Sequence, residues 1–404
     1  MFNVVIYGIG QVGTQLAYRI AEKTNFDVYG VDYFNNFKQR FIEMYPNREF
    51  DDSVFEKISM IEVFNTGFIK NKISDKKTFF MITVPTLAEG NKPDYKYVET
   101  ALKNIYTIIK KDDVILMESS VGVGYTTHFI ERFNSINNID INYGFCPERI
   151  LPDSNLKIEQ ISKIVSASKN VEEVYDFYKS FLDGEIIKAN NIYEAEACKL
   201  IENIQRDINV AYLNECKMMF DNSGLDIDFN RVIDLCRTKY SWSDYIYGMV
   251  GGNCIGNNSY YLRESMCRHE DEFSFVKKAR EINESYETYV KDKIVDFIKN
   301  NSSSMCKILF LGKGYKPNAT SSSNSREFKM YFDIVNENNN HNHVYDILDL
   351  NVDRETINKE QILNKIKNSN IIIVNGRHDF IKEFSDEIKK KKYFDYYGWL
   401  DSNE

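Results

Sequence analysis

The segment Gly251-Gly252-Asn253-Cys254 places a thiol two residues after a pair of glycines. A glycine-flanked loop can expose a cysteine, and a thiolate is a nucleophile that can hold a carbonyl carbon covalently. A lone cysteine is also often a small core residue. The N-terminal residues favour the chemical interpretation, because they have the pattern of a dinucleotide site. A hydride acceptor and a cysteine together can oxidise a substrate through a thioester.

The dinucleotide pattern is Gly8-Ile9-Gly10-Gln11-Val12-Gly13, which follows the apolar run Phe2–Tyr7 and opens a segment with helical spacing. Such glycines allow a tight turn and bring a pyrophosphate close to the helix N-terminus. Asp32 closes the second apolar run, where an acidic residue binds ribose hydroxyls and repels a 2′-phosphate. We therefore predict that Gly8, Gly10, Gln11, Val12, Gly13 and Asp32 bind a dinucleotide, with NAD favoured over NADP.

The elements around these motifs alternate between short apolar runs and segments with helical spacing. The expected strands of the first half are 2–7, 27–32, 78–84, 114–118, 141–145 and 163–167. Alternation of this kind predicts a parallel, doubly wound sheet. One amphipathic segment then runs over 191–222 without proline or glycine, which predicts a single long helix. After a second helical stretch near 270–300, three further apolar runs predict a smaller α/β domain. The expected fold is α/β, with two Rossmann-like doubly wound domains joined by a long central helix.

Composition excludes several classes of protein. The chain has 404 residues, 43% of them hydrophobic, and lacks the run of about 18 apolar residues that a membrane helix needs. Its net charge of −9 disfavours nucleic acid as a partner. Seven scattered cysteines without a CxxC pair form neither a disulfide framework nor a zinc site. We expect a cytoplasmic protein that takes no metal, with His378 a surface residue at a helix start and not a ligand.

Several further motifs follow one another in a characteristic order. They are Val84-Pro85-Thr86, Glu118-Ser119-Ser120-Val121, Phe145-Cys146-Pro147-Glu148-Arg149-Ile150-Leu151-Pro152, Lys199-Leu200-Ile201-Glu202-Asn203, the cysteine loop, and Gly314-Tyr315-Lys316-Pro317-Asn318. In the residues of its motifs and in their order along the chain, this set resembles the UDP-glucose/GDP-mannose dehydrogenase family over nearly the whole chain. Within that family it looks most like the branch that acts on UDP-N-acetylhexosamines, such as UDP-N-acetylmannosamine.

The resemblance implies an NAD-dependent, four-electron oxidation of a UDP-sugar primary alcohol to the uronic acid. Cys254 matches the family nucleophile, which traps the aldehyde as a thiohemiacetal and then carries a thioester. Lys199 and Asn203 lie one helical turn apart, so both leave the same face of the long helix. They match the pair that stabilises the reacting oxygen. Glu148 matches the glutamate that acts on the thioester and its attacking water, and Ser120 matches a hydroxyl that positions a water.

The resemblance also implies binding residues, domains and a homodimer paired through the long helix. The cofactor would further contact Val84, Pro85, Thr86 and Ser120. The UDP-sugar would contact Glu148, Arg149, Ile150, Leu151, Lys199, Asn203, Gly251, Lys316 and, across the dimer interface, Arg237. The implied domains are 1–190 for NAD, 191–300 for dimerisation with the catalytic lysine and the cysteine loop, and 301–404 for the UDP-sugar.

Two departures from the family pattern leave three functions open. Asn258 replaces an aspartate, and an amide cannot accept a proton as a carboxylate can. Ser323 replaces an arginine, for which Arg326 is a candidate substitute three residues away. The three open functions are a working dehydrogenase, an altered enzyme that releases the aldehyde, and a protein that only binds nucleotide sugars. Joint retention of Cys254, Lys199, Asn203 and Glu148 favours the working enzyme.

Overall fold

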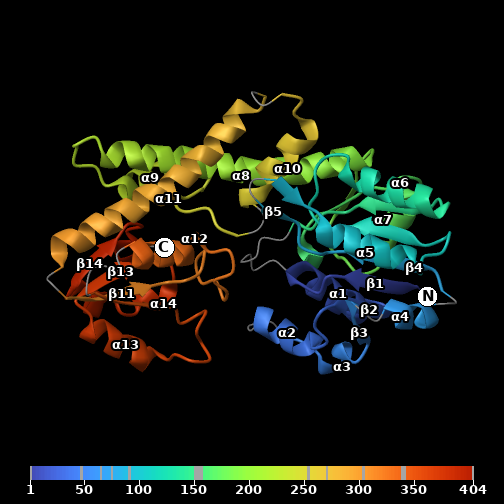
Figure 1. The fold of residues 1–404 in the computed structure, drawn as a ribbon, viewed down its shortest axis with the longest axis horizontal. Coiled ribbons are helices and arrows are strands. Elements are labelled where there is room, and N and C mark those ends of the chain that lie inside the picture. Colours follow the sequence, from blue (N-terminus) through green and yellow to red (C-terminus); the bar gives the residue numbers. More distant parts are fainter. Residues whose placement is uncertain are drawn as a thin grey trace. The chain divides into compact units, whose positions relative to one another are not determined.

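The structure is a computed structural model, which describes residues 2–45, 49–63, 66–73, 76–89, 92–149, 158–252, 255–269, 272–302, 305–337 and 343–402. The chain divides into two units. The first unit contains Met1–Glu202 and Asn257–Glu272, and the second contains Asn203–Gly256 and Phe273–Glu404. Each unit has its own parallel sheet, so the predicted α/β fold with two Rossmann-like sheets is confirmed (Figure 1).

The first unit is built on a six-stranded parallel sheet in the order β3-β2-β1-β4-β7-β8. Its strands are β1 (Asn3–Tyr7), β2 (Asp27–Asp32), β3 (Ile58–Glu62), β4 (Thr78–Ile82), β7 (Val114–Met117) and β8 (Asn142–Phe145). The chain winds outward in both directions from β1 and β4, so the strand order reverses between these two strands, the place where open α/β folds bind their ligands. A short parallel pair and an antiparallel pair complete the strands of this unit: β9 (Lys163–Val165) with β10 (Ile186–Lys188), and β5 (Leu87–Glu89) with β6 (Lys92–Asp94).

Helices cover both faces of this sheet because its strands are apolar on both faces. Alternate residues of β1 enter two different cores: Val5 and Tyr7 join one, while Val4 and Ile6 join the other. Long apolar runs of this kind are typical of strands in parallel sheets. The helices of the unit are α1 (Gln11–Lys23), α2 (Phe37–Met44), α3 (Asp52–Phe55), α4 (Thr66–Lys72), α5 (Lys96–Tyr106), α6 (Tyr125–Asn137), α7 (Val171–Lys179) and α10 (Ile255–Met266).

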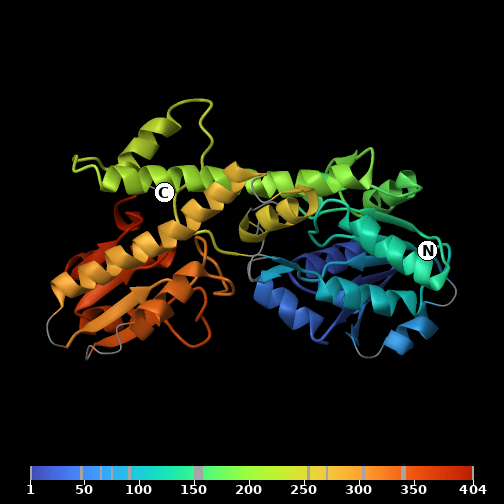
Figure 2. The ribbon, with the colours of Figure 1, turned by 45° about the horizontal axis from the view of Figure 1, so that its top comes forward.

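The second unit contains a four-stranded parallel sheet in the order β12-β11-β13-β14. Its strands are β11 (Lys307–Leu311), β12 (Val344–Leu348), β13 (Ile371–Val374) and β14 (Lys392–Asp395). Its helices are α9 (Phe229–Arg237), α11 (Ser274–Asn301), α12 (Arg326–Glu337), α13 (Lys359–Asn368), α14 (Asp379–Lys382) and α15 (Ser385–Lys389). The long helix α11 packs on β13, β14 and α12, beside which it runs in Figure 2.

The predicted long helix is confirmed as α8 (Ile192–Asp221), and the boundary between the units falls within it, after Glu202. Its length follows from the absence of proline and glycine, and the chain turns at Gly224, whose φ is +71°. No described helix is long and apolar enough to cross a membrane. The described residues also contain no group of three His, Cys, Asp or Glu side chains able to hold a metal.

Candidate functional site

The glycine turn between β1 and α1 has the geometry that a dinucleotide needs. Gly8 has φ +94°, and a Cβ on Gly13 would lie 2.0 Å from the Gly8 carbonyl oxygen. A Cβ on Gly10 would meet no atom of the described residues within 4 Å, so this side of the turn is open. Helix α1 begins at Gln11 without a side-chain cap or an acidic residue in its first turn. Its N-terminus can therefore accept a pyrophosphate, and these residues fit NAD.

Asp32 lies beside this turn at the carboxyl end of β2. Its Oδ2 accepts a hydrogen bond from the Ile9 amide at 2.6 Å, and its Oδ1 accepts one from the Tyr33 amide at 2.7 Å. The carboxylate is partly exposed and keeps acceptor capacity for ribose hydroxyls. Gln11 and Val12 occupy the first two positions of α1.

The predicted residues of two further loops lie close together. The Thr86 hydroxyl donates to the Ser120 carbonyl oxygen at 2.7 Å, and the Ser119 hydroxyl donates to the Val84 carbonyl oxygen at 2.7 Å. Pro85, between the two bonded residues, is exposed. The loops after β4 and β7 are thus joined at the carboxyl edge of the sheet, where open α/β folds bind their ligands.

Glu148 and Lys199 lie together in the first unit, both buried. The Lys199 ammonium donates to the Glu148 carbonyl oxygen at 2.5 Å, which ties α8 to the loop after β8. The Glu148 carboxylate accepts from the Arg149 amide at 2.8 Å. The sequence predicted functions for both residues, and the structure shows that they are neighbours.

A buried ionic network continues from Glu148 into the core. The Lys163 ammonium lies 2.6 Å from Glu118 Oε2 and 3.7 Å from Glu148 Oε2, and the Tyr178 hydroxyl donates to Glu118. Burial raises the pKa of Glu118, opposed by the charge of Lys163. Burial alone would lower the pKa of Lys163, but the nearby carboxylates raise it above its usual value. Sequence reasoning missed this network because its members are far apart along the chain.

Arg149 is half-buried and is turned toward α8. Its guanidinium forms a two-pronged pair with Glu202, with Nε 3.2 Å from Oε2. Hydrogen bonding to Glu202 raises the pKa of Arg149. Ile150 and Leu151, predicted with it to contact substrate, lie outside the described residues.

Two asparagines predicted to act in catalysis have buried amide groups. Asn203 leaves α8 one turn after Lys199, and Asn258 lies in α10 with only 1% of its surface exposed. The Nδ2 atoms of both lack a hydrogen-bond partner among the described residues. Buried donors are normally paired, so an orphaned one marks a place where a ligand or water can bind.

In the second unit, the glycines before Cys254 pack on the Gly314–Asn318 motif. The Gly252 amide donates to the Asn324 carbonyl oxygen at 3.0 Å. A Cβ on Gly251 would lie 2.7 Å from Tyr315 Cβ, and Gly252 has φ +82°. The glycines are thus required by close packing, which the sequence could not show. Cys254 and Asn253 lie outside the described residues.

The remaining predicted substrate contacts are less constrained. The Lys316 ammonium lies 5.1 Å from the centre of the Tyr315 ring. Arg237 forms ion pairs with Asp244 at 2.8 Å and Asp234 at 3.0 Å. Ser323 is exposed, whereas Arg326, the candidate substitute, begins α12 and lies 3.4 Å from Glu287.

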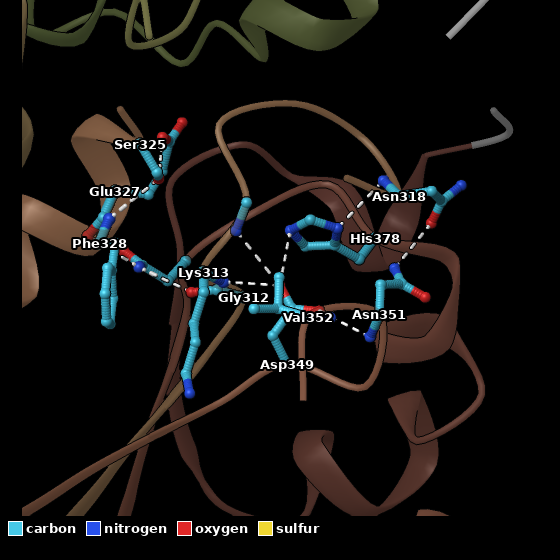
Figure 3. Close-up of polar contacts among 12 residues, drawn as sticks. Gly312, Lys313, Asn318, Ser325, Glu327, Phe328, Asp349, Asn351, Val352 and His378 are labelled. Carbon is cyan, nitrogen blue, oxygen red and sulfur yellow. Dashed lines mark hydrogen bonds and ion pairs between the residues drawn. The ribbon is translucent and has the colours of Figure 1, made fainter. Parts of the chain in front are cut away.

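The turn after β11 is closed by a buried carboxylate (Figure 3). Asp349 Oδ2 accepts from the amides of Lys313 at 2.7 Å and Gly314 at 3.2 Å. His378 lies against it, with Nε2 3.4 Å from Asp349 Oδ2 and Nδ1 accepting from the Asn318 amide at 3.0 Å. His378 does stand at a helix start, that of α14, but it is fully buried. The prediction of a surface histidine was therefore wrong: the ring lies inside the core, where the Asn318 amide donates to Nδ1 and Nε2 faces Asp349.

Residues 2–181 match the NAD binding domain of the UDP-glucose/GDP-mannose dehydrogenase family, and residues 193–285 match its central domain. The chain belongs to this family. It is an NAD-dependent nucleotide-sugar dehydrogenase, as the order of its motifs predicted.

Individual relatives agree with this assignment. The chain is 30% identical over 364 residues to the UDP-N-acetyl-D-glucosamine 6-dehydrogenase of Pseudomonas aeruginosa, covering 86% of this chain and 82% of that protein. It is 30% identical over 303 residues to Protein CapL of Staphylococcus aureus, covering 72% of this chain and 69% of that one. Among solved structures, the UDP-D-ManNAc dehydrogenase from Pyrococcus horikoshii aligns with a TM-score of 0.81 and 21% identity over 97% of this chain and 94% of that one. This last likeness shows a shared fold.

Proposed function

We propose that this enzyme oxidises the primary alcohol of a UDP-sugar, most simply a UDP-N-acetylhexosamine, to the uronic acid through a thioester on Cys254. The names of its relatives support the substrate class. The observation that carries the proposal is the buried contact between Lys199 and Glu148. The loop after β8, whose Glu148 carbonyl oxygen Lys199 contacts, lies at the same sheet edge as the glycine turn after β1.

The net reaction consumes one alcohol, two NAD⁺ and one water, and it gives one carboxylate, two NADH and three protons. NAD supplies the hydride acceptor for both oxidations. In the first oxidation the alcohol loses a proton and a hydride to become an aldehyde. The Cys254 sulfur then adds to the carbonyl carbon, loss of a second hydride leaves a thioester, and water releases the acid and the thiol.

Lys199 and Asn203 stabilise negative charge on the reacting oxygen. A positive charge and an amide donor one turn apart on a helix form an electrostatic site of the oxyanion type. The Nδ2 of Asn203 supports this role, because it is a buried donor without an acceptor in the described part of the chain.

Glu148 assists the water that hydrolyses the thioester. It is buried, and the Arg149 amide and the loop after β8 hold it in place. A carboxylate that takes a proton from water accelerates such a step about 10²- to 10⁴-fold.

Counting NADH per molecule of sugar across a panel of UDP-sugars, with mass spectrometry of the product, tests this function. We expect two NADH and one uronic acid for the preferred sugar. Cys254→Ser should still bind NAD and the UDP-sugar but make no acid, because an ester is a poorer intermediate than a thioester. Acid formation by that variant at the wild-type rate would contradict the covalent mechanism.

The alternative is an altered enzyme that stops at the aldehyde. The observation that favours it is the buried Nδ2 of Asn258, which has no hydrogen-bond partner among the described residues. The same assay separates the two functions, because release of the aldehyde yields one NADH. Asn258→Asp should raise turnover if a missing carboxylate limits the enzyme. If the site is built around the amide, the added charge should lower both turnover and thermal stability. Binding of the sugars without any NADH would indicate a binding protein.

We also propose that α8 pairs two copies of the chain as a homodimer. Several large apolar side chains of α8 are exposed, namely Tyr193, Ile201, Tyr212 and Met219. Exposed apolar side chains along one helix are typical of an interaction surface. Sedimentation equilibrium should give twice the mass of the chain, and Ile201→Glu with Tyr212→Glu should give the monomer mass.

A further inference from the structure

Lys163 is a buried lysine whose ammonium lies between two carboxylates. It comes from β9, whereas Glu118 directly follows β7 and Glu148 lies in the loop after β8. The ammonium is 2.6 Å from Glu118 Oε2 and 3.7 Å from Glu148 Oε2, and all three side chains are buried. At these distances the ammonium attracts both carboxylates, and its charge opposes the rise that burial causes in the pKa of Glu118.

The other groups around this trio come from three further positions. Tyr178 of α7 donates to Glu118, and its ring lies under the Lys163 ammonium at 4.9 Å. Cys146 is buried beside them, and burial raises its pKa to about 12, so it carries no charge at neutral pH. On the far side, the Lys199 ammonium contacts the Glu148 carbonyl oxygen. The Arg149 guanidinium, which is paired with Glu202, also interacts electrostatically with Glu148. Among the described residues, the Lys163 ammonium is the charge that lies between the two carboxylates.

We propose that Lys163 is a positioning residue that keeps Glu148 ionised and oriented for thioester hydrolysis, with Glu118 and Tyr178 holding the ammonium in place. This inference rests on the proposed function. Lys163 touches neither substrate nor cofactor in this role and acts through Glu148.

The arrangement predicts that removing the charge of Lys163 and removing the charge of Glu118 have opposite effects on the protonation of Glu148. Without Lys163, Glu148 would face Glu118 with no intervening positive charge, and protonation of one carboxyl group would become easier. Without the charge of Glu118, the ammonium would be left to Glu148 alone, and the ionised form of Glu148 would be favoured more strongly. A lysine that only fills space in the core would not produce shifts of opposite sign.

Rates measured against pH for the full-length enzyme test this proposal. The variants are Lys163→Met, Lys163→Arg and Glu118→Gln, with Lys169→Met as the control because Lys169 is a surface lysine paired with exposed Asp140. We expect Lys163→Met to move the acidic limb of the profile up by about one pH unit and Glu118→Gln to move it down. Lys163→Arg should restore most of the wild-type profile, and Lys169→Met should leave it unchanged.

The burst of NADH that precedes hydrolysis separates positioning from a general loss of structure. Lys163→Met should keep the burst and slow the steady-state rate at least 10-fold, because hydrolysis follows both hydride transfers. If Lys163→Met does not fold, Lys163→Met with Glu118→Gln removes both charges of the pair, and its acidic limb should still move up. Equal losses of burst and steady state, with an unmoved acidic limb, would overturn the proposal.

A double-mutant cycle in thermal unfolding keeps this test separate from that of the proposed function. The cycle combines Lys163→Met with Glu148→Gln and needs no turnover. The proposal is supported if the two substitutions are coupled, the wild type is active, and the acidic limbs of the pH–rate profiles shift as predicted. Coupling in an enzyme without turnover would show that the buried pair exists but that the proposed function, and the positioning role with it, is wrong. Absence of coupling in an active enzyme would overturn the positioning role alone.

Discussion

The turns after β1 and after β11 occupy the same place in two similar sheets, yet only the first is open to a ligand. In each case an aspartate at the end of the neighbouring strand accepts an amide from the turn. Asp32 accepts from Ile9 at 2.6 Å, and Asp349 accepts from Lys313 at 2.7 Å. Asp32 stays partly exposed, whereas Asp349 is fully buried under His378.

The two turns differ in the segment that each of them leads into. After β1 the chain enters helix α1 at Gln11, so a helix N-terminus points into the open turn. After β11 the chain continues for a long loop before α12 starts at Arg326, and Asp349 accepts the turn amides that a phosphate would need. A Rossmann-like topology therefore does not bind a dinucleotide by itself; the free amides and open space at the turn decide it.

Among the variants that test this comparison, Gly13→Ala should have the largest effect on stability and on NAD binding. A Cβ there would lie 2.0 Å from the Gly8 carbonyl oxygen, so the turn must move, at a cost of about 3 kcal/mol in the free energy of unfolding. NAD binding should be lost with it. Gly10→Ala is the matched control, because its Cβ would enter open space and should leave the melting temperature unchanged while weakening NAD binding. Equal melting temperatures for the two variants would contradict the described geometry.

Asp349→Asn should lower the free energy of unfolding and leave the affinity for NAD unchanged. The carboxylate accepts four backbone amides, from Lys313, Gly314, Asn351 and Val352. An amide side chain offers one acceptor oxygen instead of two, and we expect a loss of about 2 kcal/mol in the free energy of unfolding. Denaturant titration checks this value. A parallel loss of NAD affinity would show that the second turn also serves the dinucleotide.

Of the two turns, only the one after β1 could be predicted from the sequence. The glycines, Asp32 and the apolar run before them are local signals, and each keeps its meaning without tertiary contacts. The long helix α8 could be predicted for the same reason. By contrast, β3 and β14 were not identified from the sequence, because their segments, ISMIE and KYFD, mix polar and apolar residues and form no continuous apolar run.

Burial of polar residues could not be predicted, because it depends on partners far along the chain. Glu118 meets Lys163 and Tyr178 only after β7, β9 and α7 have packed. His378 meets an amide of Asn318, 60 positions earlier in the chain. Single residues of these types are most often exposed, and only the fold reveals the exceptions.

His378 gives the smallest predicted effect, a dependence of stability on pH. Burial lowers the pKa of His378, although Asp349 and Asp379 oppose that shift. Below pH 6.5 the unfolded chain binds a proton that the folded chain does not, so stability falls as pH decreases from there. We expect a loss of about 1 kcal/mol between pH 7.5 and pH 5.5 that is absent in His378→Asn, whose side chain keeps an acceptor for the Asn318 amide. A wild-type pH dependence that persists in the variant would contradict this origin.

Calorimetric titration of the wild-type enzyme with NAD and with NADP tests the central claim most directly. The open turn beside Asp32 predicts one NAD per chain, bound at least 10-fold more tightly than NADP, because the carboxylate repels a 2′-phosphate. Two sites per chain, or equal affinities for the two dinucleotides, would contradict the account.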